Sequence, residues 1–151
     1  MAKAKRIVVH CTATRQGQRL TSEYLQKIFF IERKWHHWGY HAVVYENGEW
    51  EILQPLPKAT AKGGFIDNTT MANGAQGYNM DSLHIAYMGG LDKDSGQPAD
   101  TRTEAQKQTL RVLIAEWKHI YHIDEVIGHC QLPNVHKSCP CFDAKKEYEN
   151  V

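Results

Sequence analysis

A capped amphipathic segment, residues 103–121, most constrains how this 151-residue chain can fold. The sequence Thr103-Glu-Ala-Gln106 is a capping box, which closes the start of a helix. Apolar residues then recur at intervals of three and four, as on one face of a helix; they are Leu110, Leu113, Ile114, Trp117, Ile120 and Tyr121. Such a helix must bury this face against another layer of the protein.

The other apolar segments are short, and their composition predicts strands. Residues 6–10 (RIVVH) are β-branched, which is typical of a buried central strand, and residues 82–88 (SLHIAYM) have similar character. Residues 41–46 and 49–54 flank Asn47-Gly48, the residue pair that a tight primed turn prefers. We therefore expect an antiparallel hairpin there.

A second helix is predicted over Ser22–Trp35, where apolar residues again follow helical spacing behind the N-cap candidates Thr21-Ser22. Residues 55–80 and 92–100 are polar and aperiodic, which indicates long surface loops. No internal repeat or interdomain linker interrupts the chain. The prediction is a single α/β domain spanning residues 1–151, with a mixed central β-sheet flanked by helices.

Charge and hydropathy exclude several classes of protein. The chain has 18 basic and 17 acidic residues, so no overall field attracts it to nucleic acid or to an anionic membrane. Its apolar runs are a few residues long, far short of the roughly 20 that span a bilayer. The start of the chain has no apolar region like that of a signal peptide. We expect a monomer that is made in the cytoplasm and exported only with the help of another protein.

Metal-binding residue types gather at two distant places in the sequence. His10 ends the first predicted strand, and His129 and Cys139 belong to the segment 128–140 (GHCQLPNVHKSCP). Imidazole and thiolate ligands select Zn²⁺, and two His with one Cys leave a tetrahedral position for water. The spacing alone is also compatible with a structural role for these residues. His10 could lie at the strand end without binding a metal, and Cys139 could pack as a small buried hydrophobic residue.

Five segments in order resemble one family, the zinc-dependent N-acetylmuramoyl-L-alanine amidases of type 2, which include the phage T7 lysozyme and the peptidoglycan recognition proteins. The segments are RIVVHCTAT, WGYHAVVYENG, GYNMDSLHIAYMGG, the TEAQ helix start and H-x9-C-P-C-F-D, and they run from Arg6 to Asp143. The resemblance implies a mixed sheet flanked by helices, a shallow groove and one Zn²⁺ per chain. It also implies cleavage of the amide between N-acetylmuramic acid and L-alanine in peptidoglycan.

The resemblance assigns roles residue by residue. His10, His129 and Cys139 match the family's metal ligands. Tyr40 matches the active-site tyrosine of its G-Y-H motif, and Lys137 matches the lysine of the T7-like members. In these roles Lys137 stabilises the oxyanion, and Tyr40 orients the water or passes a proton onward.

The chain also departs from the family pattern. T7-like members carry a histidine shortly before the G-Y-N motif, where this chain has Asn73-Gly-Ala-Gln76. Residues 55–73 form a longer loop than is typical, and we expect it to roof the groove. His136 and Cys141 are additional candidate ligands beside Lys137 and Cys139.

Three alternatives remain at the level of sequence. A non-catalytic relative on this fold binds peptidoglycan without cutting it, although such members typically lose the cysteine. A structural zinc site would be closed by four ligands, for example with Cys141 as the fourth. A regulatory protein partner is a further possibility, because phage lysozymes of this kind also bind a polymerase. The hypothesis that the protein is an enzyme is compatible with either a phage endolysin or a delivered antibacterial toxin.

Overall fold

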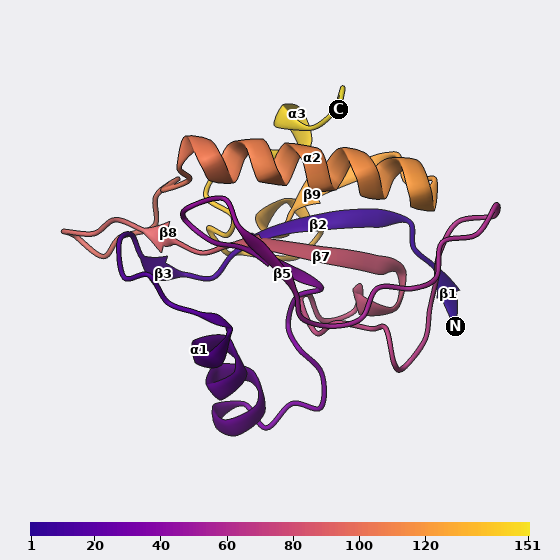
Figure 1. Ribbon diagram of the computed structural model, residues 1–151, viewed down its shortest axis with the longest axis horizontal. Helices are drawn as coiled ribbons and strands as arrows, with labels where there is room; N and C mark the ends of the chain where they lie inside the picture. The colour runs from indigo at the N-terminus through magenta and orange to yellow at the C-terminus, as the bar shows by residue number, and fades with distance from the viewer.

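The computed structural model describes all 151 residues and is built around a five-stranded mixed sheet (Figure 1). The strands lie in the order β5-β4-β7-β2-β9; their bounds are β2 Arg6–Cys11, β4 Ala42–Val44, β5 Trp50–Ile52, β7 Ser82–Tyr87 and β9 Glu125–Gly128. β4, β7, β2 and β9 are parallel, and β5 is an antiparallel edge strand. The predicted mixed sheet is thus confirmed, with the apolar segment 6–11 paired on both sides.

Two small strand pairs lie outside this sheet. They are β1 Ala2–Lys3 with β6 Phe65–Ile66, and β3 Thr14–Arg15 with β8 Gly90–Leu91. Segments of two residues are too short to show alternation, so the sequence did not predict them. Most of the remaining chain between residues 53 and 81 is loop, as expected, apart from the short helix η2 Asn79–Asp81.

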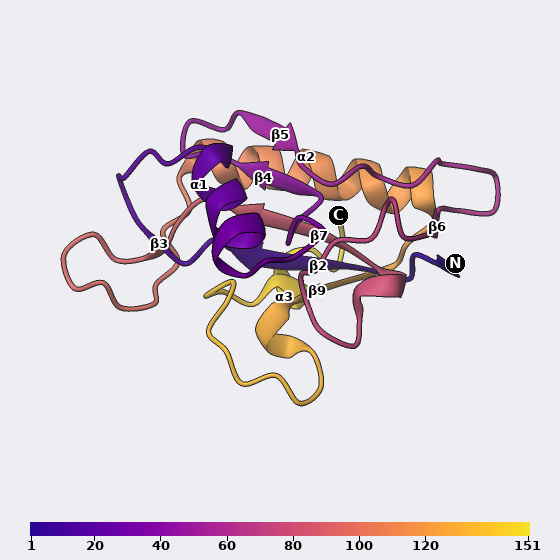
Figure 2. The ribbon, with the colours of Figure 1, turned by 90° about the horizontal axis from the view of Figure 1, so that it is seen from below.

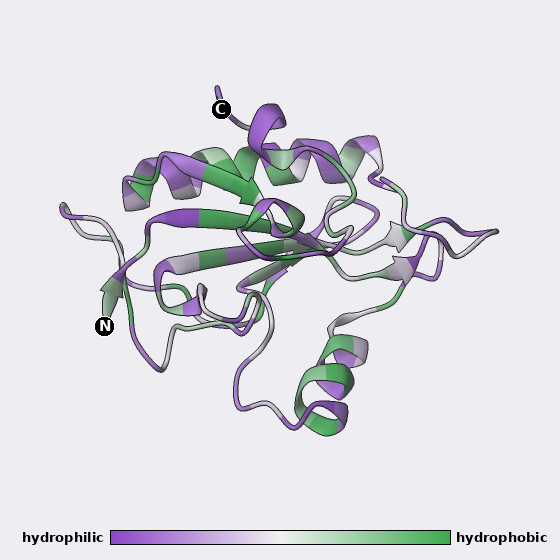
Figure 3. Ribbon diagram, turned by 180° about the vertical axis from the view of Figure 1, so that it is seen from behind, coloured by the Kyte–Doolittle hydropathy of each residue, from purple (hydrophilic) through white to green (hydrophobic).

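Helix α2, Glu104–Tyr121, covers one face of the sheet, with the short helix α3, Ala144–Glu147, beside it (Figure 1). Thr103 and Gln106 form the predicted capping box. The main core lies between α2 and the odd-numbered side chains of β2 and β7, and the hydrophobic centres of these strands are visible in Figure 3. Although α2 has 18 residues, no helix combines the length and the apolar character that crossing a membrane requires.

The opposite face of the sheet is covered by separate pieces of chain. Helix α1, Ser22–Gln26, and the helix η1, Lys27–Glu32, lie over this face (Figure 2) and pack with Val43 of β4. Val8 of β2 packs in a second small cluster farther along the face. His10 and His84 alternate with the core residues of their strands, so their side chains belong to this second face.

The helix predicted over 22–35 is confirmed as far as Glu32, but it changes type along its length and ends before Trp35. After α1 the backbone widens into the π-helix η1, in which the Arg33 N–H donates to the Ile28 carbonyl at 2.9 Å. The helix ends there because Lys34 takes a left-handed conformation (φ +56°), which reverses the chain. Trp35 then folds back and stacks on Phe29, with ring centroids 5.4 Å apart.

The hairpin is confirmed, but its turn differs from the expected two-residue type. Tyr45 pairs with Glu49, since the Tyr45 N–H donates to the Glu49 carbonyl at 2.8 Å. The loop therefore contains three residues, 46–48, and Gly48 takes a left-handed conformation (φ +89°). A glycine at the last position of a three-residue hairpin loop serves this geometry equally well, so the Asn-Gly pair alone did not specify the turn.

Candidate metal centre and active-site cavity

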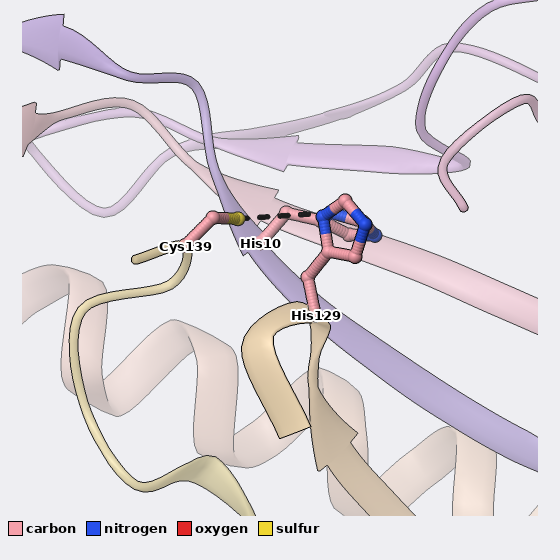
Figure 4. A group of neighbouring side chains, drawn as sticks. All are labelled: His10, His129 and Cys139. Carbon is pink, nitrogen blue, oxygen red and sulfur yellow. Dashed lines mark hydrogen bonds between the residues drawn. The ribbon is translucent and has the colours of Figure 1, made fainter. Parts of the chain in front are cut away.

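The sheet topology brings His10 and His129 together. His10 lies near the carboxyl end of β2, and His129 begins the short helix η3, His129–Gln131, directly after β9. Because β2 and β9 are parallel neighbours, their carboxyl ends meet at one edge of the sheet. The two imidazole rings lie 4.7 Å apart between centroids, and Cys139 reaches the same point from the loop after η3 (Figure 4).

The donor atoms of these three residues fit a zinc ion. They lie within 4.8 Å of one another, and His10 Nδ1 is 3.8 Å from Cys139 Sγ. Zinc–ligand bond lengths in a tetrahedral site place a nitrogen and a sulfur about 3.6 Å apart. His10 is 2% exposed and His129 is 7% exposed, so packing holds both rings in place. Three protein ligands beside an open cavity are typical of a catalytic zinc site.

Cys139 is held by the backbone around it. The Cys11 N–H donates to Cys139 Sγ at 3.1 Å, and the Cys130 N–H donates to the Cys139 carbonyl at 2.8 Å. The next residue, Pro140, accepts a bond from the Tyr87 hydroxyl at 2.7 Å. These contacts fix the sulfur atom beside the ring of His10, where it can serve as a metal ligand.

The two additional candidate ligands do not join this group. Cys141 is two residues from Cys139, but its thiol lies 3.5 Å from the Gly90 carbonyl and outside the cluster of donor atoms. His136 is exposed and also lies outside the cluster. The structure therefore brings together two histidines and one cysteine rather than the four ligands of a closed site.

The three residues lie in the wall of an open cavity of about 520 Å³. Tyr40 and Lys137 line the same cavity, so the structure brings all five residues assigned by family resemblance to one place. Arg33 is the other cation in the lining, and none of the 18 lining residues is acidic. The cavity therefore favours an anionic or carbonyl-rich ligand over a cationic one.

The loop that closes the cavity is not the one predicted. Residues 55–72 contribute nothing to its lining, whereas residues 73–77 and Asn79 do. The expected roof over the groove is thus wrong for most of its length. The short stretch directly before the G-Y-N motif forms the wall instead, because the Asn73 N–H is tied to the Trp38 carbonyl at 2.8 Å.

Burial keeps the histidines of the site uncharged. Desolvation lowers the pKa of His10 well below its usual value, and neighbouring histidines add to the effect. The pKa of His129 falls to about 4, chiefly through burial and then through the charge of Lys137. Burial also raises the pKa of Tyr40, whose hydroxyl lies 3.3 Å from the Cys11 carbonyl and donates to it. Neutral imidazoles are ready to bind metal, and Tyr40 remains a proton donor at neutral pH.

We expect the metal-free protein to lose stability between pH 6.5 and pH 4. Burial lowers the pKa of His41 from its ordinary 6.5 to about 4, so between these values the unfolded chain binds the proton that the folded chain refuses. The stabilisation is complete above pH 6.5 and is lost progressively as the pH falls towards 4. For His41 alone this amounts to about 3 kcal/mol.

Urea unfolding in chelator at pH 7 and at pH 4.5 measures this loss, and His41→Gln is the informative variant. Glutamine cannot take up the proton. The free energy of unfolding of the variant should therefore depend less steeply on pH, by the contribution of this one histidine. Equal pH dependence in the two proteins would show that His41 does not contribute.

Sequence reasoning missed His84 and Gly74. The Nδ1 atom of His84 lies 2.8 Å from Nε2 of His10, and the backbone of Gly74 packs directly against the His84 ring. The one sequence indication was a histidine within an otherwise apolar strand. That position does not say which face the side chain takes or what it contacts.

Known proteins resemble this chain over most of its length. The family model described as N-acetylmuramoyl-L-alanine amidase matches residues 1–142. The endolysin of Enterobacteria phage T3 is 29% identical over 98% of this chain and 87% of its own length, and that of Escherichia phage T7 is 29% identical over 95% and 84%.

Solved structures share the fold. The amidase LysC from Clostridium intestinale superposes with a TM-score of 0.71 at 20% identity, covering 97% of this chain and 82% of its own. Bumblebee PGRP-SA superposes with a TM-score of 0.70 at 17% identity, covering 99% of this chain and 83% of its own. At these identities the structural likeness establishes the fold alone. The family model, in contrast, matches the sequence itself over residues 1–142.

Proposed function

The chain belongs to the N-acetylmuramoyl-L-alanine amidase family and is a peptidoglycan-cleaving amidase, and from this premise we propose how its residues perform the reaction. The bond is the amide between the lactyl group of N-acetylmuramic acid and L-alanine. His10, His129 and Cys139 hold one zinc ion, and Tyr40 and Lys137 act on the substrate.

One observation carries the proposal: two histidines and one cysteine converge within 4.8 Å in the wall of an open cavity. When bound at such a site, zinc polarises a carbonyl oxygen and makes a water molecule acidic enough to act as a nucleophile near neutral pH. The burial of His10 and His129 serves this chemistry, because it keeps both rings unprotonated and fixed in place.

The two remaining residues act on developing charge. Lys137 is an exposed ammonium in the cavity wall, two residues before Cys139, and it supplies positive charge where the carbonyl oxygen becomes an oxyanion. Burial raises the pKa of the Tyr40 phenol, so it acts as a hydrogen-bond donor and not as a base. The Tyr40 hydroxyl donates to the Cys11 carbonyl at 3.3 Å, and Cys139 Sγ lies 3.8 Å from the same oxygen, so the hydroxyl lies close to the donor group.

The cavity lining also argues against cleavage of the sugar chain. Glycoside hydrolysis ordinarily uses two carboxylates facing each other across the bond. None of the lining residues is Asp or Glu, so the cavity offers no such pair. Hydrolysis of the amide requires none.

The relatives support an endolysin role for the protein, because the phage T3 and phage T7 proteins that it resembles are endolysins. We infer that it acts on the bacterial cell wall once it reaches that compartment. Peptidoglycan is then its macromolecular partner.

Digestion of purified peptidoglycan tests the proposed bond. We expect new α-amino groups of L-alanine and no new reducing sugar ends, and we expect a strong chelator to stop the release until zinc is restored. End-group analysis after digestion, with and without chelator, measures both products.

The outcomes separate the competing functions. Reducing ends without new amines would show a glycosidase. Binding of intact muropeptides without either product would show a recognition module. Full activity in chelator, with no zinc in the purified protein, would remove the metal from the mechanism.

A further inference from the structure

A buried histidine outside the donor group contacts His10, the proposed metal ligand on β2. His84 lies on the neighbouring strand β7 and is 0% exposed, and its Nδ1 atom is 2.8 Å from Nε2 of His10. It is not part of the donor group formed by His10, His129 and Cys139. Its own Nε2 atom has no hydrogen-bond partner, so the contact with His10 is the one side-chain hydrogen bond that His84 makes.

The position of His84 is fixed from the other side by His41. The Nε2–H of His41 donates to the Thr70 carbonyl at 2.6 Å, which leaves His41 Nδ1 as an acceptor. That atom accepts the backbone N–H of His84 at 2.9 Å, and the His84 carbonyl accepts the backbone N–H of His41 at 2.9 Å. Both the backbone N–H and the backbone carbonyl of His84 are therefore hydrogen-bonded to His41. These two bonds limit where the His84 ring can lie.

The hydrogen bond determines which nitrogen of His10 is free. Nδ1 of His10 faces Cys139 Sγ at 3.8 Å, so this atom is the one placed to bind a metal. Nε2 must then carry the proton, and it donates to Nδ1 of His84. Histidines that bind metal generally donate their other N–H to such a partner, which fixes the tautomer and the orientation of the ring.

Gly74 holds the His84 ring against the sheet. A Cβ atom at position 74 would lie 2.3 Å from His84 Nδ1 and 2.6 Å from Cγ, closer than atoms can approach. The backbone of Gly74 is not in the left-handed region, so the ring alone opposes an alanine there. Residue 74 also lines the cavity, which means that the loop both covers His84 and forms the wall beside the donor group.

We propose that His84 is a positioning residue for the metal centre, accepting the Nε2–H of His10 so that Nδ1 points at the ion, with Gly74 keeping the ring in place. This inference rests on the proposed function, since it takes His10 as a zinc ligand. It adds a residue, His84, that binds neither metal nor substrate. It also explains why position 74 carries no side chain.

Zinc affinity tests the inference independently of activity. The dissociation constant is measured by competition with a chromogenic chelator for the wild-type protein, His84→Leu and His84→Gln. Loss of the acceptor should weaken zinc binding by about 10- to 100-fold in His84→Leu. The amide oxygen of glutamine can accept the same bond, so His84→Gln should recover most of the affinity. The absorption spectrum of the Co²⁺-loaded proteins should change and recover in the same order.

Gly74→Ala provides a second route that leaves His84 itself intact. It should weaken zinc binding in the wild-type background, because the added Cβ displaces the ring. It should have much less effect in the His84→Ala background, where the ring is gone. This non-additivity is the mark of a direct coupling between the two positions.

Ile85→Val is the matched control, since Ile85 is buried in the same strand on the opposite face. It should leave the zinc affinity unchanged, and circular dichroism checks the fold of every variant. The inference would be overturned if folded His84→Leu bound zinc as tightly as the wild-type protein. It would also be overturned if Gly74→Ala weakened zinc binding equally in both backgrounds. Either result would leave the proposed function standing. Absence of zinc binding by the wild-type protein itself would overturn both.

Discussion

Replacing Cys139 with serine should remove the metal at neutral pH and lower amidase activity by at least about 100-fold, whereas Cys141→Ser should leave both nearly unchanged. The reason is chemical and geometric. A thiolate binds zinc far better than a hydroxyl does. Cys139 Sγ lies 3.8 Å from His10 Nδ1, while the Cys141 thiol lies against the Gly90 carbonyl.

Metal content by atomic emission and the rate of release of L-alanine amino groups measure the two effects. The two variants control for each other, because both remove one partly buried thiol from the same loop. Equal losses in both would mean that both thiols bind the ion. The site would then be closed by four protein ligands and structural in character.

Much of the fold could be predicted because its main elements are specified locally. The capping box and the periodic apolar face of residues 103–121 predicted α2 to within a residue, and the β-branched segment 6–10 predicted β2. These patterns report burial on one face or on both, which is why the layered α/β arrangement followed from them.

The errors in the fold arose where side-chain packing or a single backbone angle, and not helical spacing or turn propensity, decided the course of the chain. Helical spacing over 22–35 was correct as far as Glu32, but Lys34 is left-handed and Trp35 stacks on Phe29. The hairpin strands were confirmed, but the loop between them has three residues where two were expected. Local propensity sets which element forms, while tertiary packing sets where it ends.

The site depended on different information. The spacing of His10, His129 and Cys139 predicted a candidate zinc set, but it left open a purely structural role for each residue. Resemblance to a family selected these three together with Tyr40 and Lys137, and the structure brings all five to one cavity. His84 was missed because its role depends on which face of β7 it takes and on the loop that packs over it.

Lys137→Ala should lower the turnover number by about 100-fold or more while the protein keeps its zinc and its fold. Lys137 lines the cavity beside His129 and is not among the donor atoms, so its loss removes charge stabilisation from the transition state and leaves binding of the ion intact. Tyr40→Phe should have the same character, since the ring remains and only the hydroxyl donor is lost. Steady-state kinetics on a soluble muropeptide, with metal analysis of each variant, measure the split between catalysis and metal binding.

Two substitutions outside the cavity separate these roles from general effects of charge and hydroxyl loss. Lys145→Ala removes an exposed lysine from the same C-terminal region, and Tyr45→Phe removes a hydroxyl that is bonded at 2.6 Å to Glu51. Both should retain full turnover, because neither residue lines the cavity.

If Lys137→Ala is as active as Lys145→Ala, the oxyanion must be stabilised by another group, and Arg33 is the other cation in the lining. If zinc is lost along with activity in Lys137→Ala, the lysine acts on the conformation of the loop that carries Cys139.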